Sequence, residues 1–175
     1  MKSLTLARSE KGPMSSKNLY YTIRKSDAGY VLKEAIMNAV RNNAQDYINP
    51  PIQNIGYKGI QKTASEIIKW FDTSSNIEGE FKALANIMER GGTGGALFRN
   101  MYRDFLQQSF DLLNFEPFEE AYVEFVDIAR LWTEVSQLFI EISKTKDPIF
   151  LQNAVEKLEL ISDKEKNAMG KLSLI

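Results

Sequence analysis

The fold is decided by residues 117–144, which read PFEEAYVEFVDIARLWTEVSQLFIEISK. Apolar side chains recur along this stretch in steps of four and three, the spacing of one face of an α-helix. They are Phe118, Tyr122, Phe125, Ala129, Trp132, Val135, Phe139 and Ile142. A second apolar line widens that face and consists of Ala121, Ile128, Leu131 and Leu138. The pattern therefore predicts the long central helix of an all-α bundle.

The sequence on both sides of this stretch shows the same helical periodicity, interrupted by stop signals such as Asn49-Pro50-Pro51 and Gly91-Gly92. We expect six further helices. They begin at Ser26 or Asp27, before Ile60, at Ser75, at Gly94 or Gly95, at Pro148 and at Ser162. The sequence thus predicts a single-domain bundle of about seven helices.

Three of the predicted helix starts carry capping signals. Ser75 with Glu78, and Ser162 with Glu165, have the spacing of a capping box, in which the two side chains satisfy free backbone N–H groups. Asp147 is followed by a proline, which favours an N-cap residue with proline at the first helical position. Each signal predicts that a new helix begins there.

The N-terminal residues lack this periodicity. The polar segment SEKGPMSSKN is followed by LYYTIR, which leans toward β structure. We therefore expect an extended N-terminal linker or arm over residues 1–25 and a helical domain over 26–175. Charge is also uneven, because residues 1–63 carry 10 basic and 4 acidic side chains whereas 64–175 carry 12 and 19.

The composition excludes several kinds of chemistry. The chain has 175 residues, no Cys and no His, which rules out disulfides, thiolate zinc sites and nucleophiles activated by imidazole. We expect no catalytic residue, no metal and no cofactor in this chain. A net charge of −1 gives no general affinity for nucleic acid, and no apolar run is long enough to span a membrane. We expect a cytoplasmic protein.

The most distinctive segment is a glycine-rich turn that leads into a helix, ERGGTGGALFR at residues 89–99. Backbone N–H groups at a helix N-terminus, with nearby arginines, can bind a phosphorylated ligand. The candidate residues for this role are Arg90, Gly92, Thr93, Gly94, Gly95, Arg99 and Arg103.

A structural role for the same turn has more support, because it lacks the preceding strand and the ending of a P-loop. In that interpretation Gly91 or Gly92 ends one helix, and Gly94 and Gly95 let two helices cross closely. Glu89 then pairs with one of two arginines, Arg99 or Arg103.

Two other features remain. Tyr57 and Lys58 lie outside the strong helical patterns and are candidates for exposed contacts with a ligand or partner, although packing of the loop is the better-supported role for them. A stripe of carboxylates follows the predicted central helix. It comprises Glu120, Glu124, Asp127, Glu134 and Glu141. Di-metal sites in bundles recruit histidine as well, so a solvated polar face explains this stripe better.

Two segments of the chain resemble a known domain. They are YINPPIQNIGYKGIQKTASEIIKWF and IMERGGTGGALFRNMYRDFL. Together they are similar to the helical C-terminal domain, of unassigned function, in relatives of butirosin biosynthesis protein H, and the resemblance covers residues 27–172. The matching positions are Asn49-Pro50-Pro51, Gly56, Lys58-Gly59, Trp70, residues 91–95, Phe98-Arg99, Tyr102 and Phe105-Leu106.

The resemblance implies a function. In full-length relatives the domain follows a papain-like thiol module that holds the catalytic Cys and His, and the family includes an acyltransferase that takes its acyl group from an acyl carrier protein. This chain has neither residue, so we expect a non-catalytic companion domain that packs on such a module or on another copy of itself, as a dimer. It would shape the substrate cleft of the acyltransferase and mediate association.

The resemblance also implies an acyl carrier protein as a candidate partner of this domain. We expect neither a nucleic acid nor a membrane as a partner. The alternative function is a small binding module, in which the glycine-rich helix N-terminus holds a phosphorylated ligand or the arm of a carrier protein.

Overall fold

The computed structural model describes residues 9, 20–24, 29–91 and 94–175. Within these residues the chain is all-α and contains no strand, which confirms the predicted fold class. It divides into two compact units, Met1–Val31 and Leu32–Ile175. Most of the arm predicted over residues 1–25 lies outside the described residues.

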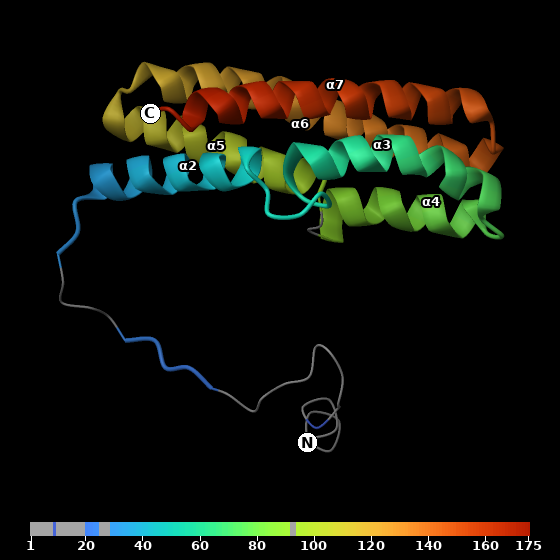
Figure 1. Cartoon of the computed structure of the whole chain (residues 1–175), viewed down its shortest axis with the longest axis horizontal. Helices are drawn as coiled ribbons and strands as arrows, with labels where there is room; N and C mark the ends of the chain where they lie inside the picture. Colours follow the sequence, from blue (N-terminus) through green and yellow to red (C-terminus); the bar gives the residue numbers. More distant parts are fainter. Residues whose placement is uncertain (1–8, 10–19, 25–28, 92–93) are drawn as a thin grey trace. The chain divides into compact units, whose positions relative to one another are not determined.

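Two long antiparallel helices form the centre of the helical unit (Figure 1). They are α6 (Glu116–Thr145) and α7 (Pro148–Leu172). The bounds of α6 agree with the predicted central helix to within one residue at each end, because its apolar face is continuous. Asp147 caps α7 as predicted, since its side chain accepts a hydrogen bond of 2.9 Å from the Ile149 N–H.

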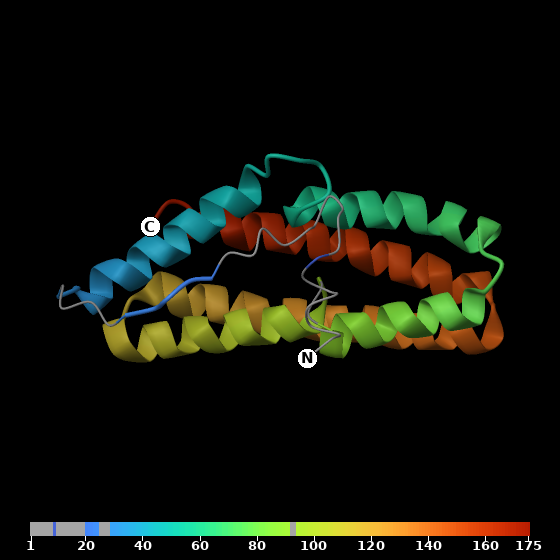
Figure 2. The ribbon, with the colours of Figure 1, turned by 90° about the horizontal axis from the view of Figure 1, so that it is seen from below.

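Two further rods lie beside this pair, and each is broken near its middle (Figures 1 and 2). One rod consists of α2 (Leu32–Ile48) followed by α3 (Gly56–Thr73). The other consists of α4 (Ile77–Asn86), a π-helical turn η1 (Ile87–Gly91) and α5 (Ala96–Leu113). One break therefore lies at the motif NPPIQNIG, and the other lies at the described glycines of the motif GGTGG, which are Gly91, Gly94 and Gly95.

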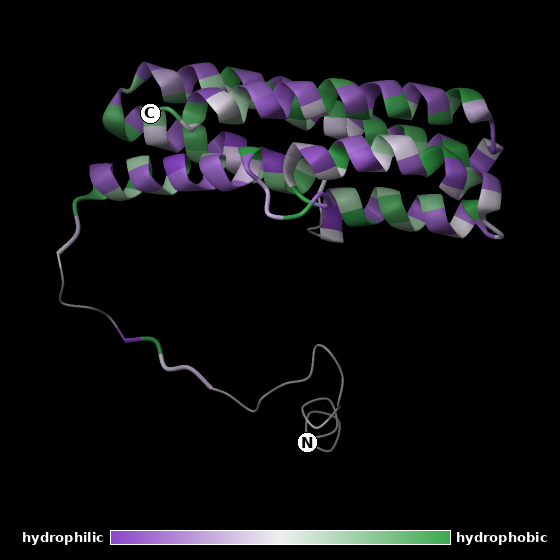
Figure 3. Ribbon diagram, viewed as in Figure 1, coloured by the Kyte–Doolittle hydropathy of each residue, from purple (hydrophilic) through white to green (hydrophobic). Residues whose placement is uncertain are grey.

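Each broken rod packs on one of the long helices. Helices α2 and α3 contact α7, whereas α4 and α5 contact α6. Figure 3 shows hydrophobic and hydrophilic residues alternating along the helices, as expected where one face of each is buried. The core includes large side chains from α3, α4, α5, α6 and α7 that are almost completely buried. They include Ile67, Phe81, Leu106, Phe118, Phe139 and Leu158.

The carboxylate stripe of α6 is more than a solvated face, because much of it pairs with lysines of α7. The pairs are Lys157–Glu134, Lys164–Asp127 and Lys171–Glu124. The three lysines are seven residues apart, so they lie on one face of α7 opposite the stripe. Partly exposed pairs of this kind each contribute little to stability. Their regular spacing matches the register of the two antiparallel helices.

The predicted count of about seven helices was wrong, since α7 runs unbroken through the expected start of a seventh. Ser162 and Glu165 are both buried rather than placed at a helix end. The Ser162 hydroxyl donates a 3.1 Å hydrogen bond to the Tyr57 carbonyl, and Glu165 accepts hydrogen bonds from other helices. The described residues therefore contain six α-helices and the turn η1.

Two predicted helix starts were also misplaced. Helix α2 begins at Leu32, after three non-helical residues, rather than at Ser26 or Asp27, which lie outside the described residues. The N-cap of α4 is Asn76 rather than Ser75, because the Asn76 side chain accepts the Gly79 N–H at 3.1 Å. None of the helices described is both long and apolar enough to cross a membrane.

Both rod breaks depend on a glycine pressed against the backbone of the preceding helix. Gly56 has φ +61°, and a Cβ there would lie 2.6 Å from the Tyr47 carbonyl oxygen. Gly95 has φ +154°, and its Cβ would lie 2.6 Å from the Met88 carbonyl oxygen. A side chain at either position would separate the two halves of a rod.

We expect Gly95→Ala to destabilise the protein more than Gly94→Ala. Gly94 also has a positive φ, +61°, but a Cβ added there would have nothing within 4 Å of it. Alanine at Gly94 should therefore lower the free energy of unfolding only by the cost of placing an L-residue in the left-handed region, about 1–2 kcal/mol. Gly95→Ala adds the clash with Met88. Urea denaturation of both variants measures the difference, and equal losses would show that the close approach does not matter.

Candidate functional site

The two broken rods meet at one buried carboxylate, that of Glu165 on α7, which is 1% exposed. Arg99 donates from Nε to Oε1 at 2.7 Å and from Nη2 to Oε2 at 2.8 Å. Trp132 donates from its indole nitrogen to Oε1 at 2.7 Å, and the Tyr47 hydroxyl donates to Oε2. This buried polar cluster links α2, α5 and α6 to α7.

The surroundings stabilise the charged pair and keep the tyrosine neutral. The Arg99 guanidinium lies over the Trp132 ring, 4.9 Å from its centroid. Burial lowers the pKa of Arg99, but the charge and hydrogen bonds of Glu165 outweigh this and raise the pKa overall. Burial, and then the neighbouring Glu165 charge, raise the pKa of Tyr47.

The geometry of the cluster favours a structural role. A carboxylate has about four acceptor positions, and four donors already fill those of Glu165. Glu165 has no lone pair free to take a proton from a substrate, so it is poorly suited to act as a general base. Within the described part of the chain, no group of three or more Asp or Glu side chains is arranged to hold a metal ion.

The arginines predicted to bind a phosphorylated ligand are largely engaged elsewhere. Arg99 pairs with Glu165, and Arg103 pairs with Asp104 at 2.6 Å. The predicted pairing of Glu89 with Arg99 or Arg103 was therefore wrong. One carboxylate oxygen of Glu89 is instead buried without a hydrogen-bond partner.

The remaining residues of the glycine-rich turn form no assembled site. Arg90 lies exposed in η1. Gly92 and Thr93 fall outside the described residues. Gly94 has open space beside it, whereas Gly95 is buried against the preceding helix. The described part of the turn therefore serves the junction between η1 and α5.

A groove of about 380 Å³ lies over the buried polar cluster, between α2 and α5. Its walls are mostly apolar and include Phe98, Met101 and Phe105. Tyr102 also lines it, and its hydroxyl is buried without a hydrogen-bond partner. Burial raises the pKa of Tyr102 above its ordinary value, because the charged form is poorly solvated there.

Tyr57 and Lys58 lie at the start of α3, where the structure adds a lysine that sequence reasoning missed. The Lys58 ammonium is 5.9 Å from the centroid of the Tyr57 ring, and that of Lys166 on α7 is 5.1 Å from it. All three residues line a surface hollow of about 650 Å³. No sequence signal connects Lys166 with Tyr57, because they are far apart in the chain.

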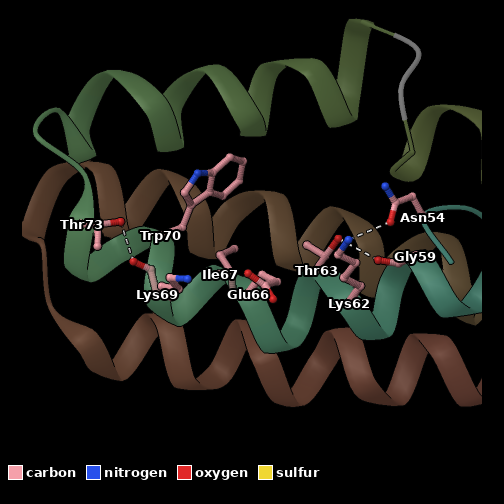
Figure 4. Close-up of a pocket in the computed structure, with 9 residues that line it drawn as sticks. All are labelled: Asn54, Gly59, Lys62, Thr63, Glu66, Ile67, Lys69, Trp70 and Thr73. Atoms are coloured by element: carbon pink, nitrogen blue, oxygen red, sulfur yellow. Dashed lines mark hydrogen bonds between the residues drawn. The ribbon is translucent and has the colours of Figure 1, made fainter.

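Trp70 is the second feature that sequence reasoning missed as a site. It is 52% exposed on α3 and stands between two hollows of about 530 and 250 Å³. Figure 4 shows its side chain projecting from α3 toward α4, with Lys62, Glu66 and Lys69 along the same helix. Ile87 lines the second hollow and is 43% exposed. An aromatic side chain with polar neighbours is thus left half uncovered.

We expect Glu165→Ala to lower the free energy of unfolding by about 3–5 kcal/mol, because Arg99 would remain buried without its partner. The control is Glu134→Ala, which removes a carboxylate from the exposed ion pairs and should cost less than about 1 kcal/mol. Urea denaturation at pH 7 measures both. Similar decreases in the free energy of unfolding for the two variants would show that the cluster does not stabilise the fold more than an exposed ion pair does.

Stability should also fall at alkaline pH. The pKa values of Tyr47 and Tyr102 are raised above the ordinary value of 10.0, so the unfolded chain loses these protons first. Their contribution is fully present below pH 10 and decreases above it, by about 1.4 kcal/mol per pH unit for each tyrosine. Tyr102→Phe should make this slope shallower without loss of stability at pH 7. The free energy of unfolding is measured by urea denaturation between pH 8 and 11. If its dependence on pH is the same in Tyr102→Phe as in the unmodified chain, Tyr102 is not the cause of the alkaline loss of stability.

Comparison with known proteins gives one match. The model of a family described as a domain of unknown function, DUF4872, matches residues 2–172. Neither a curated protein nor a solved structure gives a match. The matched region contains both rod breaks and the whole buried polar cluster. The chain therefore belongs to the DUF4872 family.

Proposed function

We propose that this chain is a non-catalytic helical companion domain that packs on a papain-like thiol acyltransferase module. The resemblance to relatives of butirosin biosynthesis protein H supports this proposal. The observation that carries it is Trp70, a half-exposed aromatic side chain between two surface hollows. The domain would shape the substrate cleft of its partner and mediate association in the cytoplasm.

The chemistry of the chain favours a companion over an enzyme. There is no Cys and no His, so the chain cannot supply a thiol nucleophile or an imidazole base. Its buried carboxylate at Glu165 is saturated by hydrogen bonds, and several carboxylates of α6 pair with lysines. What the chain offers to other molecules is therefore its surface.

The surface around Trp70 has the features of a protein interface. Tryptophan is enriched among the residues that contribute most to binding, where its large apolar area is removed from water. Ile87 extends the apolar area toward α4, and Lys62, Glu66 and Lys69 provide a polar rim. An apolar centre with a polar rim is the usual organisation of such interfaces.

A second copy of the chain is the other partner that this surface would suit. A companion domain without its neighbour exposes the same apolar area, and dimerisation covers it. An acyl carrier protein would join the assembly through the acyltransferase module. The alternative, a binding module for phosphorylated ligands, would rest on Arg90 and the glycine-rich turn, since Arg99 and Arg103 are engaged in ion pairs.

We expect Trp70→Ala to weaken association by about 30-fold, the effect of removing a strong interface residue. Calorimetric titration with a papain-like thiol module measures binding to the partner, and light scattering over a range of concentrations measures self-association. The matched control is Val123→Ala, because Val123 is 61% exposed but lies on α6. The proposal fails if the unmodified chain neither dimerises nor binds the module, or if Trp70→Ala associates as well as the unmodified chain.

A further inference from the structure

We infer that the basic patch in the hollow near the start of α3, lined by Tyr57, Lys58, Lys62 and Lys166, docks an acidic protein surface. This inference rests on the proposed function, because it states the charge that the partner presents beside Trp70. It also assigns a role to Tyr57 and Lys58, which the buried polar cluster and the rod breaks leave without one.

The patch is a surface hollow with a one-sided charge. Its volume is about 650 Å³, and its lining has three lysines and no carboxylate. The lining residues are Gln53, Tyr57, Lys58, Gln61, Lys62, Ser65 and Lys166. Amide and hydroxyl groups complete it, so the lining can donate hydrogen bonds to anionic oxygens at several points. Residues 32–175 as a whole carry 16 basic and 21 acidic side chains, so this local excess of positive charge runs against the average.

Lys166 differs from the other lysines along α7. Lys157, Lys164 and Lys171 each form an ion pair with a carboxylate of α6. Lys166 lies instead beside Tyr57 on α3, and among the described residues it forms no ion pair. Its positive charge is therefore not compensated as theirs are.

One lysine of the patch also lies at the positive end of a helix dipole. Lys58 is the third residue of α3, and the N-terminus of a helix already carries partial positive charge. The like charges of the three lysines that line this hollow repel one another, and a bound anionic surface would relieve that repulsion. The Tyr57 ring attracts two of these ammonium groups and so favours their gathering at one place.

The patch is continuous with the surface around Trp70. Lys62 lines both the basic hollow and the 530 Å³ hollow beside Trp70. A partner that covers Trp70 with an apolar group would therefore place neighbouring side chains over the lysines. Carboxylates at those positions would complement the patch, steer the encounter and fix the orientation of docking. The acidic excess of the whole domain disfavours a nucleic acid there, which would be repelled beyond the patch.

The test uses a fluorescein-labelled peptide of ten glutamates as the probe for an acidic surface, with binding followed by fluorescence anisotropy. We expect the unmodified chain to bind it at low salt and to lose affinity as salt rises. Replacing Lys58, Lys62 and Lys166 together with Gln should weaken binding at least about tenfold, from the loss of three charge contacts.

The matched control is the triple Gln variant of Lys157, Lys164 and Lys171, which has the same net charge but keeps the patch. It should bind the peptide within about twofold of the unmodified chain, because those lysines face α6 carboxylates. Equal losses in the two triple variants would overturn the inference. So would tighter binding of a single-stranded DNA oligonucleotide than of the peptide, or full displacement of the peptide by millimolar inorganic phosphate.

The outcome separates this inference from the proposed function. Trp70→Ala should retain binding of the glutamate peptide while losing association with the thiol module or a second copy. A different outcome is that the triple Gln variant of the patch loses the peptide but Trp70→Ala still associates with the thiol module or a second copy. That result would support the acidic docking site and contradict the companion role.

Discussion

The buried carboxylate of Glu165 is the constraint on which the rest of the structure depends. A charged group with 1% exposure is tolerated only when its charge and lone pairs are fully matched. The hydrogen-bond donors to Glu165 come from three other helices. Two of the donor residues lie next to rod breaks. Tyr47 is near the end of α2, and Arg99 is in the first turn of α5. The cluster thus couples the two breaks, which the prolines and glycines of the sequence create, and it holds the four rods together.

The interrupted rods in turn create the surface that the proposed function uses. A new helix, α3, begins after the first break. Its N-terminal residues Tyr57 and Lys58 therefore lie at the surface beside α7. Farther along α3, Trp70 projects toward α4 and is only half covered. The buried polar cluster and the apolar core stabilise the bundle by themselves. The domain can therefore expose this surface and stay folded when no partner is bound.

The sequence predicts the helices well where one apolar face runs without interruption. The bounds of α6 follow from its periodicity, and the Asp147 cap from the proline after it. The prediction fails at Ser162 and Glu165, because a capping box and two buried positions three residues apart on a helix have the same spacing. The Trp70 surface and the basic patch could not be predicted from local patterns, since they depend on packing between distant segments. Lys166 meets Tyr57 only after α7 packs on α3.

The Glu165 cluster couples the two rod breaks. Hydrogen–deuterium exchange of Glu165→Gln, compared with the unmodified chain, tests this coupling most directly, because exchange reports local opening segment by segment. Exchange should be faster at both breaks together, in the last turn of α2 and the first turn of α5. Protection near the turn that joins α6 to α7 should be unchanged. Faster exchange confined to α7, or spread uniformly over the chain, would contradict the claim.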